Sequence, residues 1–208
     1  KFTNNSDVVT LDSEFARLVV LFSARYGTGG ANFPAVITSQ EPPLIFARPD
    51  STAVFQWIRL NGSPGNWTGW ANQSNNPVGG TYFVAAYQSK ETDTYGMRLW
   101  DETSKLLFDT GTPCAQFTSV ITSWTYLGST NTSVGRWSFN WSSPAPLGNG
   151  DYMLLNNIAM DIPGTDTFSK LSCSWNYSNN TITVLLQNIG DFNGSSLFLP
   201  LMFAKPIL

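Results

Sequence analysis

The chain has 208 residues, of which 12% are charged, about half of the ~25% that is usual for globular domains. Small hydrogen-bonding residues replace the missing charge, because Ser, Thr and Asn together number 61. The sequence contains no histidine, which excludes Ser-His-Asp and Cys-His catalysis, His-ligated zinc and a histidine pH switch. The 11 Lys and Arg residues are scattered among 14 Asp and Glu, so we expect no nucleic-acid partner.

The apolar runs, the cysteines and the Asn-x-Ser/Thr triplets bear on membrane spans, disulfides and glycosylation. The longest apolar run, residues 18–22, is far shorter than the ~20 residues that span a bilayer, so we expect no membrane span. Cys114 and Cys173 are too few for a disulfide framework, and we favour free thiols over a bridge. Nine Asn-x-Ser/Thr triplets are expected by chance at this content of Asn, Ser and Thr, and do not by themselves indicate a glycoprotein.

Short apolar runs with a period of two, separated by clusters of Gly, Pro, Asn and Asp, predict many short strands. The predicted strands are residues 15–25, 43–47, 53–60, 81–88, 95–100, 105–109, 117–127, 135–141, 168–177, 181–187 and 197–203. The fold class is therefore all-β, with an antiparallel β-sandwich-like architecture. The Thr112-Pro113 step suggests two β subdomains, 1–112 and 113–208; one sandwich with an elaborated second half is the alternative.

Two hairpins can be predicted down to their register. A two-residue turn at Asn179-Asn180 would place every apolar residue of one hairpin on one face, which makes Cys173 a core thiol. Its pairs would be Tyr177/Ile182, Trp175/Val184 and Cys173/Leu186. A four-residue loop at residues 101–104 would give the other hairpin an apolar face, with the pairs Leu99/Leu106 and Met97/Phe108.

Two segments have more apolar surface than a half-buried strand needs. Residues 53–60 carry apolar side chains on both faces, Phe55 and Trp57 among them, and the C-terminal segment contains Leu201 and Phe203. Such segments pack on their own domain or on a neighbouring chain. We therefore expect these four residues as candidate oligomer contacts.

A second candidate site is a loop-like segment, residues 61–74. Trp67 and Trp70 lie there between the amides of Asn66 and Asn72, and a flat ring beside amides is a common way to bind sugars or proteins. Packing of the segment onto its own domain is the simpler alternative. We keep the four residues as a candidate ligand site.

Carboxylates are the only plausible acid and base groups, and no two of them stand out as a catalytic pair. The candidates are Glu41, Asp93, Asp101, Glu102, Asp109, Asp151, Asp161, Asp166 and Asp191. Asp161, Thr165 and Asp166 offer oxygens for Ca²⁺, but the EF-hand pattern is absent and an Asx turn explains them. We expect no enzyme, no metal and no cofactor.

Two motifs resemble those of small bacteriophage tail proteins. Residues 41–50 read Glu-Pro-Pro-Leu-Ile-Phe-Ala-Arg-Pro-Asp, and residues 95–111 form a Tyr-Gly-Met-Arg-Leu-Trp-Asp hairpin closing on Leu-Leu-Phe-Asp. The resemblance covers residues 35–111, and the usual Gly-Lys of the hairpin loop is Ser104-Lys105 here.

The resemblance implies a non-enzymatic structural component of the virion, at the tail tip or fibre. Such a component would form a symmetric homo-oligomer, for which we favour a trimer, and would contact other tail proteins and a glycan or receptor on the host surface. A carbohydrate-binding module or adhesin domain is the alternative function.

Overall fold

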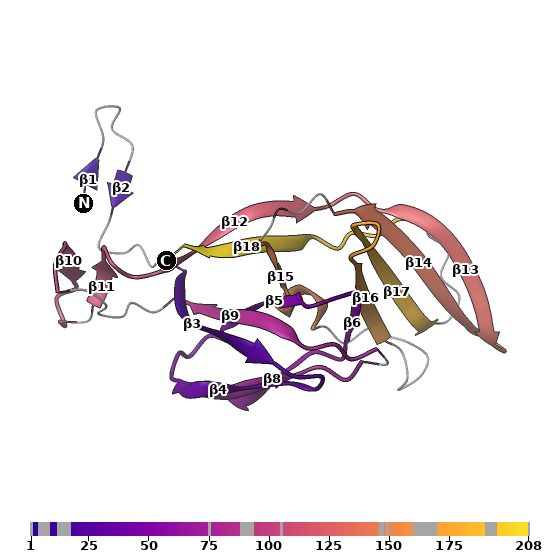
Figure 1. Ribbon diagram of the computed structural model, residues 1–208, viewed down its shortest axis with the longest axis horizontal. Coiled ribbons are helices and arrows are strands. Elements are labelled where there is room, and N and C mark those ends of the chain that lie inside the picture. Colours follow the sequence, from indigo (N-terminus) through magenta and orange to yellow (C-terminus); the bar gives the residue numbers. More distant parts are fainter. Residues whose placement is uncertain are drawn as a thin grey trace.

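The computed structural model describes residues 2–3, 9–11, 18–74, 76–87, 94–104, 106–145, 148, 150–159, 170–189 and 195–207. Within these ranges the chain forms eighteen strands and one short 3-10 helix, η1 (Asn156–Ile158), which confirms the all-β prediction. No helix in this part of the chain has the length and hydropathy needed to cross a membrane. Two small hairpins, β1 (Phe2–Thr3) with β2 (Val9–Leu11) and β10 (Arg98–Trp100) with β11 (Leu106–Asp109), project from one end (Figure 1).

Six antiparallel strands close into a small barrel in the order β12-β18-β15-β5-β9-β3. They are β12 (Cys114–Ile121), β18 (Leu201–Ile207), β15 (Tyr152–Leu154), β5 (Leu44–Pro49), β9 (Gly80–Ala86) and β3 (Val19–Tyr26). The pairing of Cys114 with Val19 closes it. Three of its strands precede residue 112 and three follow it, so the expected boundary there does not separate two hydrogen-bonded units.

The two faces of the barrel strands pack differently, because successive side chains of a strand point to opposite sides. Phe46 stacks on Phe83 with ring centroids 4.6 Å apart and contacts Phe117 at 6.1 Å. Phe117 is on β12, which is not a neighbour of β5, so this face fills the barrel interior. The opposite face, with Ile45 and Phe203, packs against the flanking sheets.

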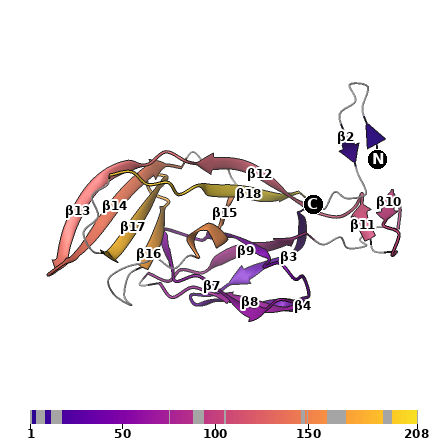
Figure 2. The same ribbon diagram turned by 180° about the vertical axis from the view of Figure 1, so that it is seen from behind.

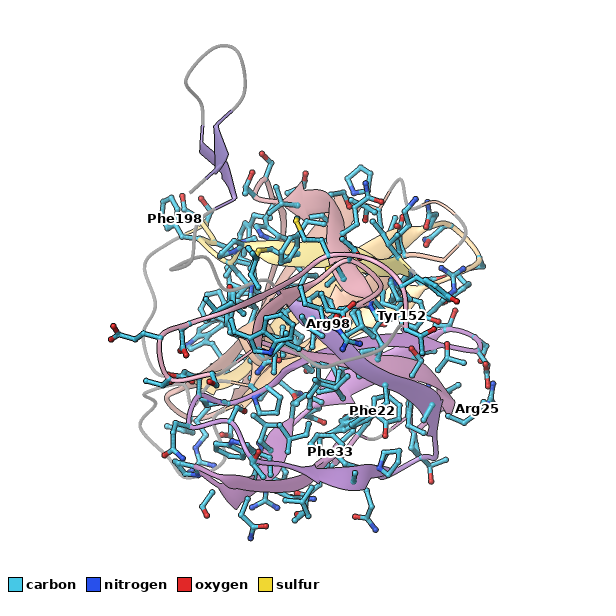
Figure 3. The ribbon with its side chains drawn as sticks, turned by 90° about the vertical axis from the view of Figure 1, so that its left-hand side faces the viewer. Phe22, Arg25, Phe33, Arg98, Tyr152 and Phe198 are labelled. Atoms are coloured by element: carbon cyan, nitrogen blue, oxygen red, sulfur yellow. The ribbon has the colours of Figure 1, made fainter. Side chains whose placement is uncertain are left out.

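A three-stranded sheet covers one side of the barrel, below β3 and β9 in Figures 1 and 2. Its order is β4 (Gly30–Ile37), β8 (Asn66–Ala71) and β7 (Arg59–Ser63). Phe22 of β3 and Phe33 of β4 face each other between the two layers, with ring centroids 5.5 Å apart (Figure 3). The sequence did not predict β4 or β8, because β4 begins at a glycine and contains Pro34, and β8 follows the Gly- and Pro-containing turn at residues 62–65. A Cβ at Gly69 would collide with the Ala31 carbonyl, so glycine is what permits this strand pair.

A five-stranded sheet packs against another part of the barrel, in the order β13-β14-β17-β16-β6. Its strands are β13 (Thr125–Ser133), β14 (Arg136–Pro144), β17 (Thr181–Ile189), β16 (Lys170–Asn176) and β6 (Ala53–Gln56). The predicted strand 53–60 breaks at Trp57, whose φ of 49° is left-handed, so β6 and β7 enter different sheets. The predicted strand 117–127 likewise divides into β12 and β13.

Both predicted hairpin registers are wrong, with different consequences. In β16–β17, Trp175 pairs with Ile182 and Cys173 with Val184, two residues away from the predicted register, around the loop at residues 177–180. An even shift keeps every side chain on its face, so Cys173 is a buried core thiol as predicted, and both cysteines are free. In β10–β11, Leu99 pairs with Phe108 and Trp100 with Leu106, and the hairpin stands outside the barrel.

Candidate functional site

The tryptophans of the predicted ligand site lie in strand β8 and not in a loop. Trp67 and Trp70 are 7% and 1% exposed, so neither ring is an open platform. Trp67 Nε1 donates a hydrogen bond to the Ser39 carbonyl at 3.0 Å. Trp70 packs against Tyr26 and Tyr82, with ring centroids 5.1 and 5.9 Å away. The alternative of packing onto the chain's own domain accounts for both rings.

Asn72 has a structural partner as well. Its Oδ1 accepts a hydrogen bond from the Gln56 amide at 3.0 Å, and its Nδ2 donates to the Val54 carbonyl at 3.5 Å. The Gln73 amide donates to the Gln56 carbonyl at 3.0 Å, so this segment covers the outer edge of β6. Only Asn66 of the four predicted ligand residues is exposed. The four side chains therefore do not converge on one open surface.

Of the four predicted oligomer contacts, three are buried and one is exposed. Phe55, Leu201 and Phe203 are buried inside the chain, and Phe203 packs on Trp175 with ring centroids 5.7 Å apart. These three residues are core and do not reach another chain, because the five-stranded sheet and the barrel cover each other there. Trp57 is 43% exposed and stays a predicted contact.

Three of the candidate carboxylates of the described ranges have partners within the fold. Asp109 pairs with Arg98, Asp151 accepts a bond from the Gly148 amide, and Asp101 accepts two from Thr103 in its own turn. The described residues contain no group of three or more His, Cys, Asp or Glu that is arranged to hold a metal. The candidates outside these ranges are Asp93, Asp161, Thr165, Asp166 and Asp191.

The motif at residues 41–50 joins the two halves of the chain. Its polar atoms bond residues more than 100 positions away: the Pro43 carbonyl accepts from Asn156 Nδ2 at 3.0 Å, Arg48 Nη1 donates to the Asp151 carbonyl at 3.0 Å, and the Pro49 carbonyl accepts from the Tyr177 hydroxyl at 2.8 Å. The Arg48 guanidinium also lies over the rings of Trp175 and Tyr177. These contacts hold the two halves of the chain together at this motif.

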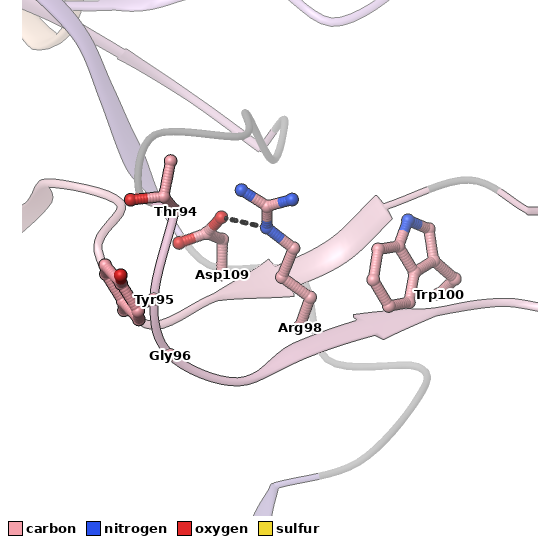
Figure 4. A pocket seen from close by; sticks show the side chains of 6 residues that line it. All are labelled: Thr94, Tyr95, Gly96, Arg98, Trp100 and Asp109. Atoms are coloured by element: carbon pink, nitrogen blue, oxygen red, sulfur yellow. Dashed lines mark hydrogen bonds and ion pairs between the residues drawn. The ribbon is translucent and has the colours of Figure 1, made fainter.

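A pocket of about 270 Å³ lies in the projecting β10–β11 hairpin. It is lined by Thr94, Tyr95, Gly96, Arg98, Trp100 and Asp109 (Figure 4). Tyr95 is 90% exposed and Trp100 is 49% exposed, so two large rings are available to solvent at this pocket. No sequence pattern pointed to this pocket, although all six residues lie in or next to the second motif of the tail-protein resemblance.

Fixed hydrogen bonds hold the polar side of the pocket. The side chain of Asp109 is 2% exposed; its Oδ2 accepts from Arg98 Nε at 2.8 Å and its Oδ1 from the Gly111 amide at 2.8 Å. The Met97 amide donates to Thr110 Oγ1 at 3.1 Å, and Gly96 has a φ of 130°. A Cβ at Gly96 would collide with Thr110 Oγ1, so glycine is required here. The guanidinium of Arg98 is thus oriented between Asp109 and the ring of Trp100 (Figure 4).

The five-stranded sheet has one apolar and one uncharged polar face. A row across the core face is Tyr126, Trp141, Val184, Cys173 and Phe55. The next row, on the opposite face, is Thr125, Ser142, Thr183, Ser174 and Val54, all exposed or half-buried. In the five strands only Arg136 and Lys170 are charged, and each is the first residue of its strand. The row from Thr125 to Val54 carries four hydroxyl side chains and no charge; the row beside it, Asn140, Leu185, Ser172 and Gln56, is also uncharged, and its last two residues are buried.

Comparisons of the chain with protein-family models, with curated proteins and with solved structures found no match.

Proposed function

We propose that this chain is a structural component of a bacteriophage tail, at the tail tip or fibre, and acts through contacts with other protein subunits and not through catalysis. The observation that carries the proposal is the uncharged outer face and open edge of the five-stranded sheet. The two motifs that resemble small tail proteins supply the virion context. A homo-oligomer, with a trimer favoured, and neighbouring tail proteins are the proposed partners.

The uncharged face supports assembly through its low cost of desolvation. Burying a hydroxyl or amide that finds a new hydrogen bond costs far less than burying a charge, which needs a matched partner to offset it. Charged residues are correspondingly depleted at the cores of protein interfaces. The row through Ser142, Thr183 and Ser174 has this composition across the sheet.

One edge of this sheet is covered and the other is open among the described residues. Asn72 and Gln73 cover the β6 edge, whereas β13 pairs only with β14 among the described strands. Natural edge strands are usually short or carry Lys, charge or Pro, which prevents pairing with another chain. β13 is nine residues long, and no charged residue occurs from Thr110 to Gly135. We infer that β13 accepts a strand from a neighbouring subunit.

The solution mass, measured by light scattering, tests the proposal. We expect a trimer or a larger closed ring. The double variant Leu127→Lys/Thr130→Lys on β13 should dissociate it, because lysines on an edge oppose strand addition. The matched control is Val36→Lys/Thr38→Lys, which adds the same charge at exposed positions near the end of β4 and should leave the mass unchanged.

A monomer at all protein concentrations, or an assembly that tolerates the β13 lysines, would contradict the proposal. Monomeric behaviour together with glycan affinity would favour the alternative function, a carbohydrate-binding module or adhesin domain.

A further inference from the structure

The geometry points to a saccharide-binding subsite in the β10–β11 pocket, which holds one sugar ring against Trp100 with Arg98 as the polar contact. The assembly role proposed above does not need this pocket, so the two can be tested separately.

The size of the pocket limits the ligand. Its volume of about 270 Å³ lies just below the roughly 300–1,000 Å³ of pockets that hold drug-sized molecules. One sugar ring, such as the terminal unit of a longer glycan that continues into solvent, is a ligand of this size.

The rings of the pocket suit the apolar face of a sugar. Trp100 and Tyr95 are exposed and line a pocket, whereas Trp70 and Trp141 are buried in the core. An exposed indole or phenol gives a flat apolar surface with a polar tip, on which the C–H face of a pyranose can stack. Both rings line the pocket, with the Arg98–Asp109 pair between them, and Trp100 is the ring on the Arg98 side (Figure 4).

The charges of the pocket favour a neutral ligand with many hydroxyls. Asp109 neutralises Arg98, and therefore the pair offers no excess charge to a phosphate or to a cation. A guanidinium and the hydroxyls of Thr94 and Tyr95 present donors and acceptors side by side, which is what vicinal sugar hydroxyls require. Because Asp109 is almost fully buried, it acts as a positioning residue that orients Arg98 and does not itself contact the ligand.

The position of the hairpin keeps the pocket accessible in an assembly. β10 and β11 lie at one end of the molecule and β13 at the other, and Figures 1 and 2 agree on this. Strand addition at β13 would therefore leave the pocket open to solvent.

The test is a titration of the full chain with methyl glycosides of glucose, galactose, N-acetylglucosamine and rhamnose, followed by saturation-transfer NMR. We expect saturable binding of at least one probe with a Kd of about 1–10 mM, as is typical of a ligand with so few atoms. Trp100→Ala should weaken this binding by about tenfold or more, because the stacking surface is lost. Trp100→Phe, which keeps a ring, should bind within about threefold of the unmodified chain.

Trp57→Ala is the matched control, because Trp57 is exposed to a similar degree but does not line the pocket. It should bind the probe like the unmodified chain. The proposal is overturned if no probe saturates, if Trp100→Ala binds normally, or if Trp57→Ala weakens binding as much as Trp100→Ala does. The solution mass of each variant, measured in the same samples, distinguishes a failure of the saccharide subsite from a failure of assembly.

Discussion

Replacing Asn72 by alanine tests whether this residue is structural or ligand-binding. The substitution removes the acceptor of the Gln56 amide and the donor to the Val54 carbonyl. Gln56 is buried, so its N–H loses its partner away from water, which costs about 1–3 kcal/mol. We expect Asn72→Ala to lower the free energy of unfolding by about 2 kcal/mol, which lowers Tm by roughly 4–8 °C in a chain of this length.

Urea denaturation and thermal unfolding of the two proteins measure this difference. Asn66→Ala is the control, because Asn66 lies in the same segment with an exposed side chain, and we expect it to change stability by less than about 0.5 kcal/mol. If Asn72→Ala were as stable as the unmodified chain, the edge-covering role of Asn72 would be refuted. Equal losses in both variants would refute the distinction between the two amides.

Three further predictions concern the core and the pocket. Phe203→Ala should destabilise the chain by about 3–5 kcal/mol in urea, because the ring is fully buried; a lower solution mass without lost stability would restore its predicted contact role. Burial raises the pKa of Cys173 to about 12 and also raises the pKa of Tyr26, whereas the unfolded chain ionises these groups at ordinary values. Above about pH 9 the thiol ionises in the unfolded chain but not in the folded chain. The free energy of unfolding should therefore decrease there, by about 1.4 kcal/mol per pH unit for the thiol. The urea midpoint should shift accordingly, and a flat profile to about pH 11 contradicts the burial of both groups. Gly96→Ala should disorder the β10–β11 hairpin, seen as altered amide resonances confined to it, because the new Cβ meets Thr110.

The sequence predicted which face of a strand each side chain lies on better than it predicted which residues pair across strands. Alternation along residues 171–175 assigned Leu171, Cys173 and Trp175 to the core, and all three are buried there. The predicted turn was Asn179-Asn180, which satisfies the rules of a tight turn, whereas the observed loop has four residues, 177–180, so the register differs by two. Two registers that differ by two residues place the same side chains on the same face. Packing between the paired strands selects one of them, and the residues of the turn do not specify that packing.

The predicted ligand site at residues 61–74 was wrong because the composition of this segment resembles that of a loop. The Gly- and Pro-rich segment around Trp67 contains a strand, since Gly69 lets β8 approach β4 closely, and both tryptophans are buried in the core that this sheet shares with the barrel. The pocket at Trp100 was missed for the converse reason. An aromatic residue in a predicted hairpin resembles core until the hairpin is found outside the barrel.

By itself, the sequence determined the all-β class, the exclusion of histidine chemistry and the low charge of the strands, because these depend only on residue types and on a period of two. The tertiary structure decided which apolar residues are core and which are exposed, and it joined the two halves of the chain in one barrel. Such contacts link residues more than 100 positions apart, as between Arg48 and Asp151, and no local pattern specifies them. The uncharged face is encoded in single residues, but its extent across β14, β17 and β16 arises only from their pairing.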